Sequence, residues 1–401
     1  MEMLLQFGYG MMEHCRHLVE EWNGGTAVLS PRDLNGSQMQ RLAKSIRAMV
    51  GGKVMLDPQF YLPHADHARL CQHDYWPKNY QTNAFWQGPA LVELLTKLES
   101  LNRTLGCDVF ILPGLLAAAV DDDWLETQRA IQSEAVSLNS SLPIYATIAL
   151  SADAAKNNNQ VARLMDESEK WPAKGYYLVF EHPNGEYLVD DGNWLANVLD
   201  ITAGLKLRGA KVVMGYCNHQ MLIAACAGVD ALCSGTWMNV RSFPPDKFRV
   251  SYDDEIKQRA TWFYCPQALS EYKIPMLDLA HRQRILDDLK PDRTFDNAYV
   301  QPLFAGAQPS SVGFTEQSAF RHYLHCLRLQ AQAASQTTFD ATVSAHHTLL
   351  DAVERRLKAL SSAGISGQLR DFRNIIDCNR GALAAFVATR GPMLRHHWSS
   401  L

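Results

Sequence analysis

The sequence lacks the motifs of several large enzyme classes. It contains no Walker-type phosphate loop, no Gly-x-Ser-x-Gly nucleophile elbow and no His-Glu-x-x-His zinc motif. Its first closely spaced glycines, GYG at 8–10, are followed by MME, so the GxGxxG loop of dinucleotide-binding proteins is absent as well. These absences argue against a P-loop NTPase, a serine hydrolase of the α/β type, a zincin protease and a Rossmann dehydrogenase.

Signals for secretion and for membrane insertion are also missing. The N-terminal sequence MEMLLQFGYG has neither a basic n-region nor a long apolar core, and no run of about 18 uninterrupted apolar residues occurs. The nine cysteines are odd in number and form no CxxC pair. Several lie inside apolar runs, which is typical of reduced, mostly buried thiols. We therefore expect a cytoplasmic protein without a membrane span.

Charge of one sign is not in large excess. The net charge of the 401 residues is −4, which gives no global indication of nucleic-acid binding. The charge is unevenly spread, however, because residues 315–401 contain 10 Lys+Arg and 6 Asp+Glu, and residues 1–314 contain 28 and 36. A basic C-terminal part on an acidic body indicates a polyanion partner, and a solvated helical surface is the alternative.

Short apolar runs alternate with helical segments throughout residues 3–234. The eight runs are Met3–Gly8, Thr26–Ser30, Lys53–Leu56, Asp108–Leu112, Ile144–Leu150, Tyr176–Phe180, Lys211–Gly215 and Asp230–Cys233. Continuous apolar runs are typical of strands that are buried on both faces. Eight β/α units of this length predict an α/β fold, a (β/α)8 TIM-type barrel. The alternative is an open doubly wound sheet, which would normally carry a glycine-rich loop after its first strand.

Helical periodicity follows most of the runs and dominates the C-terminal part. Helices are predicted at Glu13–Trp22, Ser37–Val50 with Ser37 as N-cap, Pro89–Leu105, Trp124–Asn139, Asn159–Trp171, Trp194–Arg208, Gln220–Ala227, Glu316–Gln332, Thr342–Ser361 and Gly367–Thr389. We expect residues 1–314 to form the barrel, with an insertion or extension over its mouth after about residue 238. Residues 315–401 are predicted to form an appended helical domain.

Polar residues stand directly after several of the runs. In a parallel barrel these positions converge on one mouth, where the chemistry of such enzymes is located. Asp57 follows the third run and is fixed by Pro58, and Glu181 follows the sixth run. Two carboxylates at one mouth suit the cleavage of a glycosidic bond, because one stabilises positive charge or activates water and the other handles a proton. Asp33 is a third carboxylate of this kind.

Each carboxylate also has a purely structural interpretation. Asp57 and Asp33 could cap a turn or a helix, and Glu181 could pair with Arg32 or Arg241. Aromatic residues crowd the same loops, where they could stack on a flat base or sugar, or could simply pack the loops. These residues are Phe60, Tyr61, Tyr75, Trp76, Phe85, Trp86 and Trp237.

A group of potential metal ligands lies in the third loop. His64, His67, Cys71 and His73 have suitable side chains, but their spacing does not match the usual zinc sites. The first strand is also not followed by the His-x-His pair of metal-dependent amidohydrolases. We therefore predict no metal and no cofactor.

Three segments carry a resemblance to a known family: LDPQFY at 56–61, FEHPNG at 180–185 and GYCNHQ at 215–220. With the eight-run layout of residues 3–240, they resemble the tRNA-guanine transglycosylase-like barrel superfamily. The chain is most similar to the members that act on DNA, which include deazaguanine DNA transglycosylases and antiphage glycosylases that remove glucosylated hydroxymethylcytosine. The CxCxxC…H zinc site of the tRNA enzymes is absent. The resemblance therefore favours base removal over base exchange.

The resemblance implies a DNA glycosylase that excises a modified base, of the glucosylated hydroxymethylcytosine type, from phage DNA and leaves abasic sites as an antiviral defence. Asp57 would face the anomeric carbon, and Glu181 would hold a proton or a substrate hydroxyl. The other residues predicted to bind the base, its sugar adduct or the neighbouring rings are Asp33, Gln59, Phe60, Tyr61, Tyr216, Asn218, His219 and Trp237. The residues predicted to bind DNA phosphates are Arg355, Arg356, Lys358, Arg370 and Arg373.

Three alternatives remain open from the sequence. The first is a transglycosylase that exchanges a 7-deazaguanine-type base in DNA or tRNA, which would incorporate a labelled free base. The second is a hydrolase or lyase that uses the same barrel on a small molecule and is indifferent to DNA. The third is a binding module without catalytic activity, which would tolerate the loss of both Asp57 and Glu181.

Overall fold

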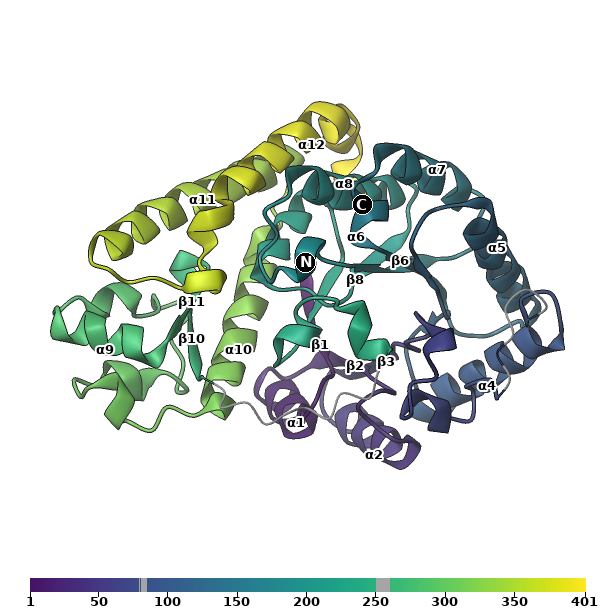
Figure 1. Cartoon of the computed structure of the whole chain (residues 1–401), viewed down its shortest axis with the longest axis horizontal. Helices are drawn as coiled ribbons and strands as arrows, with labels where there is room; N and C mark the ends of the chain where they lie inside the picture. The colour runs from purple at the N-terminus through teal and green to yellow at the C-terminus, as the bar shows by residue number, and fades with distance from the viewer. Residues whose placement is uncertain (79, 81–84, 250–259) are drawn as a thin grey trace.

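A barrel of parallel strands forms the centre of the structure, a computed structural model that describes residues 1–78, 80, 85–249 and 260–401. Within these residues, eight strands surround the barrel axis (Figure 1). They are β1 (Glu2–Gln6), β2 (Gly25–Leu29), β3 (Gly52–Leu56), β4 (Phe110–Ile111), β6 (Ile144–Leu150), β7 (Gly175–Phe180), β8 (Lys211–Met214) and β9 (Ala231–Ser234). Each corresponds to one of the eight apolar runs.

The strands follow one another around the barrel in the order β3-β2-β1-β9-β8-β7-β6-β4, and every ladder is parallel. The two ends of this order, β3 and β4, meet through the amide of Asp108, which donates to the carbonyl of Val54 at 3.1 Å. A short ninth strand, β5 (Leu116–Ala117), pairs with the end of β6. The barrel is therefore nearly closed, and the predicted (β/α)8 fold is confirmed.

Strand β7 shows why continuous apolar runs form such a barrel. All six of its residues are buried. Tyr177 and Val179 pack in the cluster that fills the barrel interior, and Tyr176 and Leu178 pack in a second cluster with the outer helices. Because successive side chains of a strand point to opposite faces, a strand that is covered on both sides needs apolar residues at every position.

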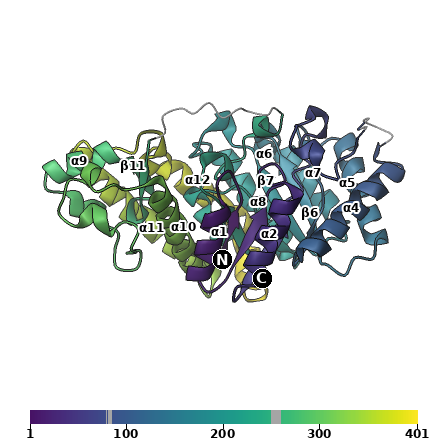
Figure 2. The same ribbon diagram turned by 90° about the horizontal axis from the view of Figure 1, so that it is seen from below.

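Helices cover the outside of the barrel (Figures 1 and 2). They are α1 (Met12–Glu21), α2 (Gly36–Arg47), α4 (Pro89–Leu105), α5 (Asp122–Ser137), α6 (Ala152–Lys156), α7 (Asn158–Ser168) and α8 (Gly192–Leu207). The predicted helix at Gln220–Ala227 is a 3₁₀ helix, His219–Ala227. The predicted N-cap Ser37 is wrong, because α2 is capped by Asn35, whose side chain accepts from the amide of Gln38.

The remainder of the chain packs against one side of the barrel. Its elements are the antiparallel pair β10 (Trp262–Cys265) and β11 (Ser270–Lys273), and the helices α9 (Ile274–Arg282), α10 (Glu316–Ala334), α11 (Phe339–Ser362) and α12 (Ile376–His397). Figure 1 shows α11 and α12 side by side, with α12 reaching α8 of the barrel. The β10–β11 pair contacts α10. The C-terminal region is helical as predicted, although α12 begins at Ile376 rather than at Gly367; a domain boundary at residue 314 stays a prediction.

The two ends of the chain lie close together, at the end of the barrel where the strands begin (Figures 1 and 2). Lys206 connects this region, because its amine donates to the carboxylate of Asp230 and to the carbonyl of Leu401, at 2.9 Å each. All nine cysteines are free, and seven of them are buried. None of the helices in the described ranges is long and apolar enough to cross a membrane.

Candidate active site at the mouth of the barrel

The carboxylate of Asp57 lies at the end of the barrel where the strands terminate. Asp57 follows the last residue of β3 and is only 1% exposed. Its Oδ1 accepts from the amide of Gln59 at 3.0 Å and from the hydroxyl of Tyr61 at 2.8 Å. Its Oδ2 accepts from the hydroxyl of Tyr216 at 2.7 Å. A buried carboxylate is thus held by three donors in a fixed orientation.

The contacts of Asp57 show that it lies over the barrel axis. Tyr216 follows β8, which is four strands away from β3 in the strand order and therefore on the opposite side of an eight-stranded barrel. The hydroxyl of Tyr177 on β7 also reaches Oδ2, at 3.5 Å, and donates to Gln6 of β1. Hydrogen bonds from opposite walls therefore converge on one carboxylate.

Burial raises the pKa of Asp57, and the hydrogen bonds from Tyr216, Tyr61 and Gln59, with the charge of Lys247, oppose this rise. The pKa values of Tyr61 and Tyr216 are raised well above the usual range, first by burial and then by the carboxylate. The phenols therefore stay protonated and act as donors. A buried carboxylate with a raised pKa and fixed donors makes Asp57 a candidate functional residue.

Two residues around Asp57 have left-handed backbone conformations that side chains other than glycine rarely adopt. Gln59 has φ 54° and Tyr216 has φ 57°. The side-chain amide of Gln59 joins the two loops, because Nε2 donates to Tyr216 at 3.1 Å and to Ser30 at 2.9 Å. Such strain commonly accumulates at functional sites, where surrounding contacts hold it in place.

Asp33 belongs to the same network through Ser30. The hydroxyl of Ser30 lies 2.7 Å from Asp33 Oδ2 and 3.1 Å from Gln59 Oε1. Arg32 pairs with Asp33 at 3.0 Å and donates its Nε to the carbonyl of Lys247 at 2.8 Å. Asp33 is therefore the second carboxylate of the Asp57 network, and it is not the cap of α2.

Glu181, the second predicted catalytic residue, is at the same rim but in a different position. It follows β7, and its Oε2 accepts from the amide of Ala152 at 3.0 Å, at the beginning of α6. Arg32 and Arg241, its alternative partners from the sequence, pair with Asp33 and Glu271 instead. No hydrogen bond within the described residues joins Glu181 to Asp57.

Aromatic side chains pack against the two tyrosines that donate to Asp57. Phe243 and Phe248, from the segment after β9, lie 5.0 and 5.1 Å from the ring of Tyr61. Phe243 also lies 5.2 Å from the ring of Tyr216. The amine of Lys247 stands over the ring of Tyr216, 4.1 Å from its centroid. The two tyrosines that hold Asp57 are therefore packed against the rings of Phe243 and Phe248 and the amine of Lys247.

The predicted aromatic and amide ligands divide between this site and other places. Phe60 is wholly buried in a cluster with Trp76, Tyr80, Phe85 and Trp86. Asn218 caps the 3₁₀ helix and donates to the carbonyl of Tyr187 at 2.6 Å. His219 is buried among aromatic rings, and this burial lowers its pKa to about 4. The structure therefore brings Gln59, Tyr61 and Tyr216 to Asp57, and Phe60, Asn218 and His219 elsewhere.

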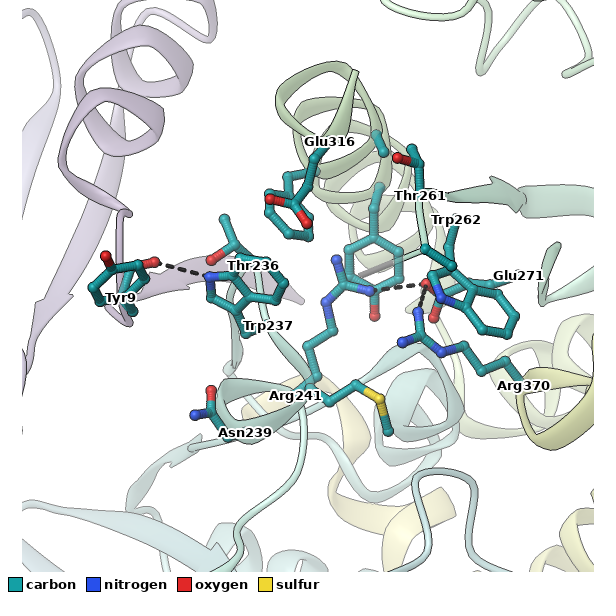
Figure 3. Close-up of a pocket in the computed structure, with 15 residues that line it drawn as sticks. Tyr9, Thr236, Trp237, Asn239, Arg241, Thr261, Trp262, Glu271, Glu316 and Arg370 are labelled. Carbon is teal, nitrogen blue, oxygen red and sulfur yellow. Dashed lines mark hydrogen bonds and ion pairs between the residues drawn. The ribbon is translucent and has the colours of Figure 1, made fainter. Parts of the chain in front are cut away.

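A cavity of about 400 Å³ lies between the barrel and the C-terminal region, and its lining includes none of the residues that bind Asp57 (Figure 3). The guanidinium groups of Arg241 and Arg370 both bind Oε2 of Glu271, at 3.2 and 2.8 Å. Burial would raise the pKa of Glu271, but the charges of the two arginines lower it to about 2. Trp237 lines the cavity and donates to the carbonyl of Tyr9 at 3.0 Å (Figure 3).

The His64–His73 group does not converge on one point. His73 contacts the carbonyl of Pro31 at 2.7 Å, and His64 packs against the ring of Tyr80. His67 accepts from the amide of Arg69. Among the residues described, no three His, Cys, Asp or Glu side chains are arranged to hold a metal ion.

Three of the five predicted phosphate-binding residues are already paired with carboxylates. Arg356 pairs with Asp288, Arg373 with Asp371, and Arg370 with Glu271 in the cavity. The other two, Arg355 and Lys358, are exposed on α11. If this surface binds DNA, these two are the best placed to contact phosphates.

Tyr177 and Lys247 also contact the Asp57 network, although neither residue is predicted from the sequence. Tyr177 lies inside a strand, where its hydroxyl had no signal that separated it from core packing. Lys247 lies in the proline-rich segment after β9, which folds back over the mouth. Neither residue stands directly after a strand, which was the position used to select candidate site residues.

Comparisons with known proteins give no match: no family model, no curated protein and no solved structure is similar to this chain at a significant level. The resemblance to transglycosylase-like barrels thus stays a prediction from three short segments. The function has to be argued from the site itself.

Proposed function

We propose that the protein is a DNA glycosylase that removes a modified base, with Asp57 as the catalytic carboxylate. The observation that carries this proposal is the position of Asp57: a buried carboxylate over the barrel axis, oriented by Tyr61, Tyr216 and Gln59. Cleavage of an N-glycosidic bond builds positive charge on the sugar carbon C1′. A fixed anion in a buried site stabilises that charge more in the transition state than in the ground state.

The steps follow from this charge. The bond between C1′ and the base breaks, and the base leaves with the electron pair and takes up a proton. Water then adds to C1′, and Asp57 accepts the proton that the water loses. The product is a free base and an abasic sugar. Asp57 must be ionised for both roles, although its burial favours the neutral form.

A base can reach Asp57 only if it leaves the DNA stack, as in other enzymes that act on bases. Phe243 and Phe248 now occupy the space over Tyr61 and Tyr216. A flipped base that displaces one of these rings would contact the rings of Tyr61 and Tyr216, which Phe243 and Phe248 now meet edge to face.

The test is to incubate the protein with unmodified DNA and with DNA that carries glucosylated hydroxymethylcytosine, and to count abasic sites. We expect abasic sites in the modified DNA only. Asp57→Asn should lower their formation at least ~100-fold, the usual scale for the loss of one electrostatic or acid–base group. Asp108→Asn is the matched control, because Asp108 precedes β4 at the opposite end of the barrel.

Other outcomes separate the remaining alternatives. Full activity of the Asp57→Asn protein would contradict the role of Asp57 and make Glu181 the next residue to test. Incorporation of a labelled free base would indicate base exchange. An absence of abasic sites in every DNA would overturn the proposal.

A further inference from the structure

Lys247 is a buried lysine with an unusual set of neighbours. It is 6% exposed, and its amine donates to the carbonyl of Asn239 at 2.5 Å. No carboxylate forms an ion pair with it within the ranges that the structure describes. The amine instead stands over the ring of Tyr216, 4.1 Å from its centroid, and 4.9 Å from that of Phe248.

A second buried lysine shows the contrast. Lys206 is 2% exposed, but its amine pairs with the carboxylate of Asp230 at 2.9 Å. Lys206 is therefore buried together with a carboxylate partner. Lys206 lies at the far end of the barrel beside Leu401, whereas Lys247 lies at the mouth.

The surroundings of Lys247 favour the neutral amine, which is the nucleophilic form. Burial, and then the positive charge of Arg32, lower the pKa of Lys247 to about 7, while Asp33 and Asp57 act in the opposite direction. Lysines in such positions form imines with carbonyl compounds in many enzymes. The side chain also lies next to Tyr216, whose hydroxyl contacts Asp57.

Base removal by Asp57 leaves an abasic sugar, which opens to an aldehyde at C1′. We propose that the amine of Lys247 attacks this aldehyde and that the protein then cleaves the DNA strand by β-elimination. The inference rests on the proposed glycosylase function, because that reaction supplies the aldehyde. It adds a strand-cleaving lyase activity to base removal.

The chemistry is balanced without an oxidant or a reductant. The neutral amine adds to C1′, and the carbinolamine takes up a proton from the solvent and loses water to give a protonated imine. The Asp57 carboxylate takes a proton from C2′, a double bond forms between C2′ and C3′, and the bond from C3′ to oxygen breaks. The downstream strand leaves as a phosphomonoester. Water then hydrolyses the imine, which releases an unsaturated aldehyde and restores the amine.

The experiment uses the full-length protein and an oligonucleotide with one abasic site made beforehand, so that base removal is not required. Sodium borohydride reduces an imine to a stable amine and leaves the protein covalently attached to the DNA. We expect a covalent adduct and, without borohydride, a strand break on the 3′ side of the abasic site. Digestion of the wild-type adduct and mass spectrometry should place the DNA on Lys247, a result that needs no variant.

Variants sharpen the test. Lys247→Arg keeps a hydrogen-bond donor at this position, but guanidinium is not a nucleophile, so the adduct should fall to background. Lys206→Arg is the matched buried control and should form as much adduct as the wild type. Folding of both proteins is checked by circular dichroism. Should Lys247→Arg fail to fold, the position of the adduct in the wild-type protein decides the question.

The two proposals can fail separately. A wild-type protein that gives no adduct and no strand break, or an adduct on another lysine, overturns the role of Lys247 while base release stands. Asp57→Asn should still form the adduct on the prepared abasic DNA, although it releases no base. Adduct formation without base release from any DNA would sustain the lyase and overturn the glycosylase.

Discussion

A carboxylate that is as deeply buried as Asp57 lowers the stability of the folded protein at neutral pH. Burial raises its pKa above the value of 3.8 that an ordinary aspartate has, despite three hydrogen bonds and a nearby lysine. The folded state therefore binds a proton more readily than the unfolded state in the pH range between these two pKa values. Stability is then lost as the pH rises through this range.

Asp57→Asn should therefore be more stable than the wild type at pH 7, because the buried charge is removed. Each pKa unit of the shift corresponds to about 1.4 kcal/mol. The difference in melting temperature should shrink as the pH is lowered toward 3.8. Thermal unfolding of both proteins over this pH range measures it. A gap that widens on acidification would contradict the raised pKa.

The hydroxyl of Tyr216 is predicted to matter more than that of a tyrosine outside the site. Tyr216→Phe removes a hydrogen bond to Asp57 and leaves Nε2 of Gln59 with one partner fewer. The pKa of Asp57 should rise further, so base release should need a higher pH. Stability should fall by about 1–3 kcal/mol from the lost buried hydrogen bonds.

Tyr176→Phe provides the control, since this hydroxyl donates to the carbonyl of Ser168 on the outer side of β7. Its loss should cost about 1 kcal/mol and leave the pH profile of base release unchanged. The pH–rate profile and urea unfolding of both variants give the comparison. Equal pH–rate profiles for the two variants would contradict a role of Tyr216 in the site.

Among the elements, α2 begins two residues before the position predicted from the sequence, because its N-cap is Asn35 and not Ser37. Asn35 and Gln38 form a reciprocal capping box, and Ser37 donates to Asn35 at 2.9 Å. Asn and Ser cap helices about equally well, so the residue type alone does not decide between them. The backbone does, because Asn35 has an extended conformation and Ser37 is already helical.

The capping geometry gives an element-scale prediction. Asn35→Ala should lower the free energy of unfolding by about 1 kcal/mol, the usual cost of losing an N-cap. Ser37→Ala should cost less, because the Asn35 oxygen still accepts from the amide of Gln38. Denaturant unfolding measures both free-energy differences, provided that the variants and the wild type have equal m-values. A larger effect of Ser37→Ala would restore Ser37 as the cap.

At the scale of the whole molecule, the ion pairs show which basic residues of the C-terminal region are still available to a polyanion. Most of the predicted basic surface is neutralised by ion pairs, and Arg355 and Lys358 remain exposed on α11. If this surface binds DNA, replacing both with Glu should weaken binding and reduce its dependence on salt by about one phosphate contact per residue. Binding titrations at several salt concentrations measure this.

Lys97→Glu is the control for this surface, because Lys97 lies on α4, on the other side of the barrel, and already pairs with Glu93. It should leave the salt dependence unchanged. The same loss in both proteins would indicate a general charge effect. Unchanged affinity of the Arg355/Lys358 variant would place the DNA on another face.

The sequence was sufficient for the barrel because the relevant signal is local. Each strand is buried on both faces, so each appears as an uninterrupted apolar run, and the runs at Ile144–Leu150 and Tyr176–Phe180 coincide with β6 and β7 almost to the residue. Helix boundaries were less certain, as at Gly367, because the short 3₁₀ turns before Ile376 have the same residue pattern as a helix.

Only the site residues that directly follow strands could be predicted from the sequence. Asp57 and Tyr216 follow strands directly, so the barrel geometry alone brings them to one mouth. Lys247 and Phe248 reach the same place because the segment after β9 folds back across the opening. Strand periodicity says nothing about the path of such a segment.

The sequence by itself determined the eight strands, the helices around them and the rim where Asp57 and Glu181 both lie. The tertiary structure decided that Asp57 is joined to Tyr216 across the barrel and that Glu181 turns to the amide of Ala152. The physical reason is the distance along the chain over which each signal acts. Apolar periodicity reflects burial of each segment, whereas the partner of a polar side chain depends on which loops meet above the barrel.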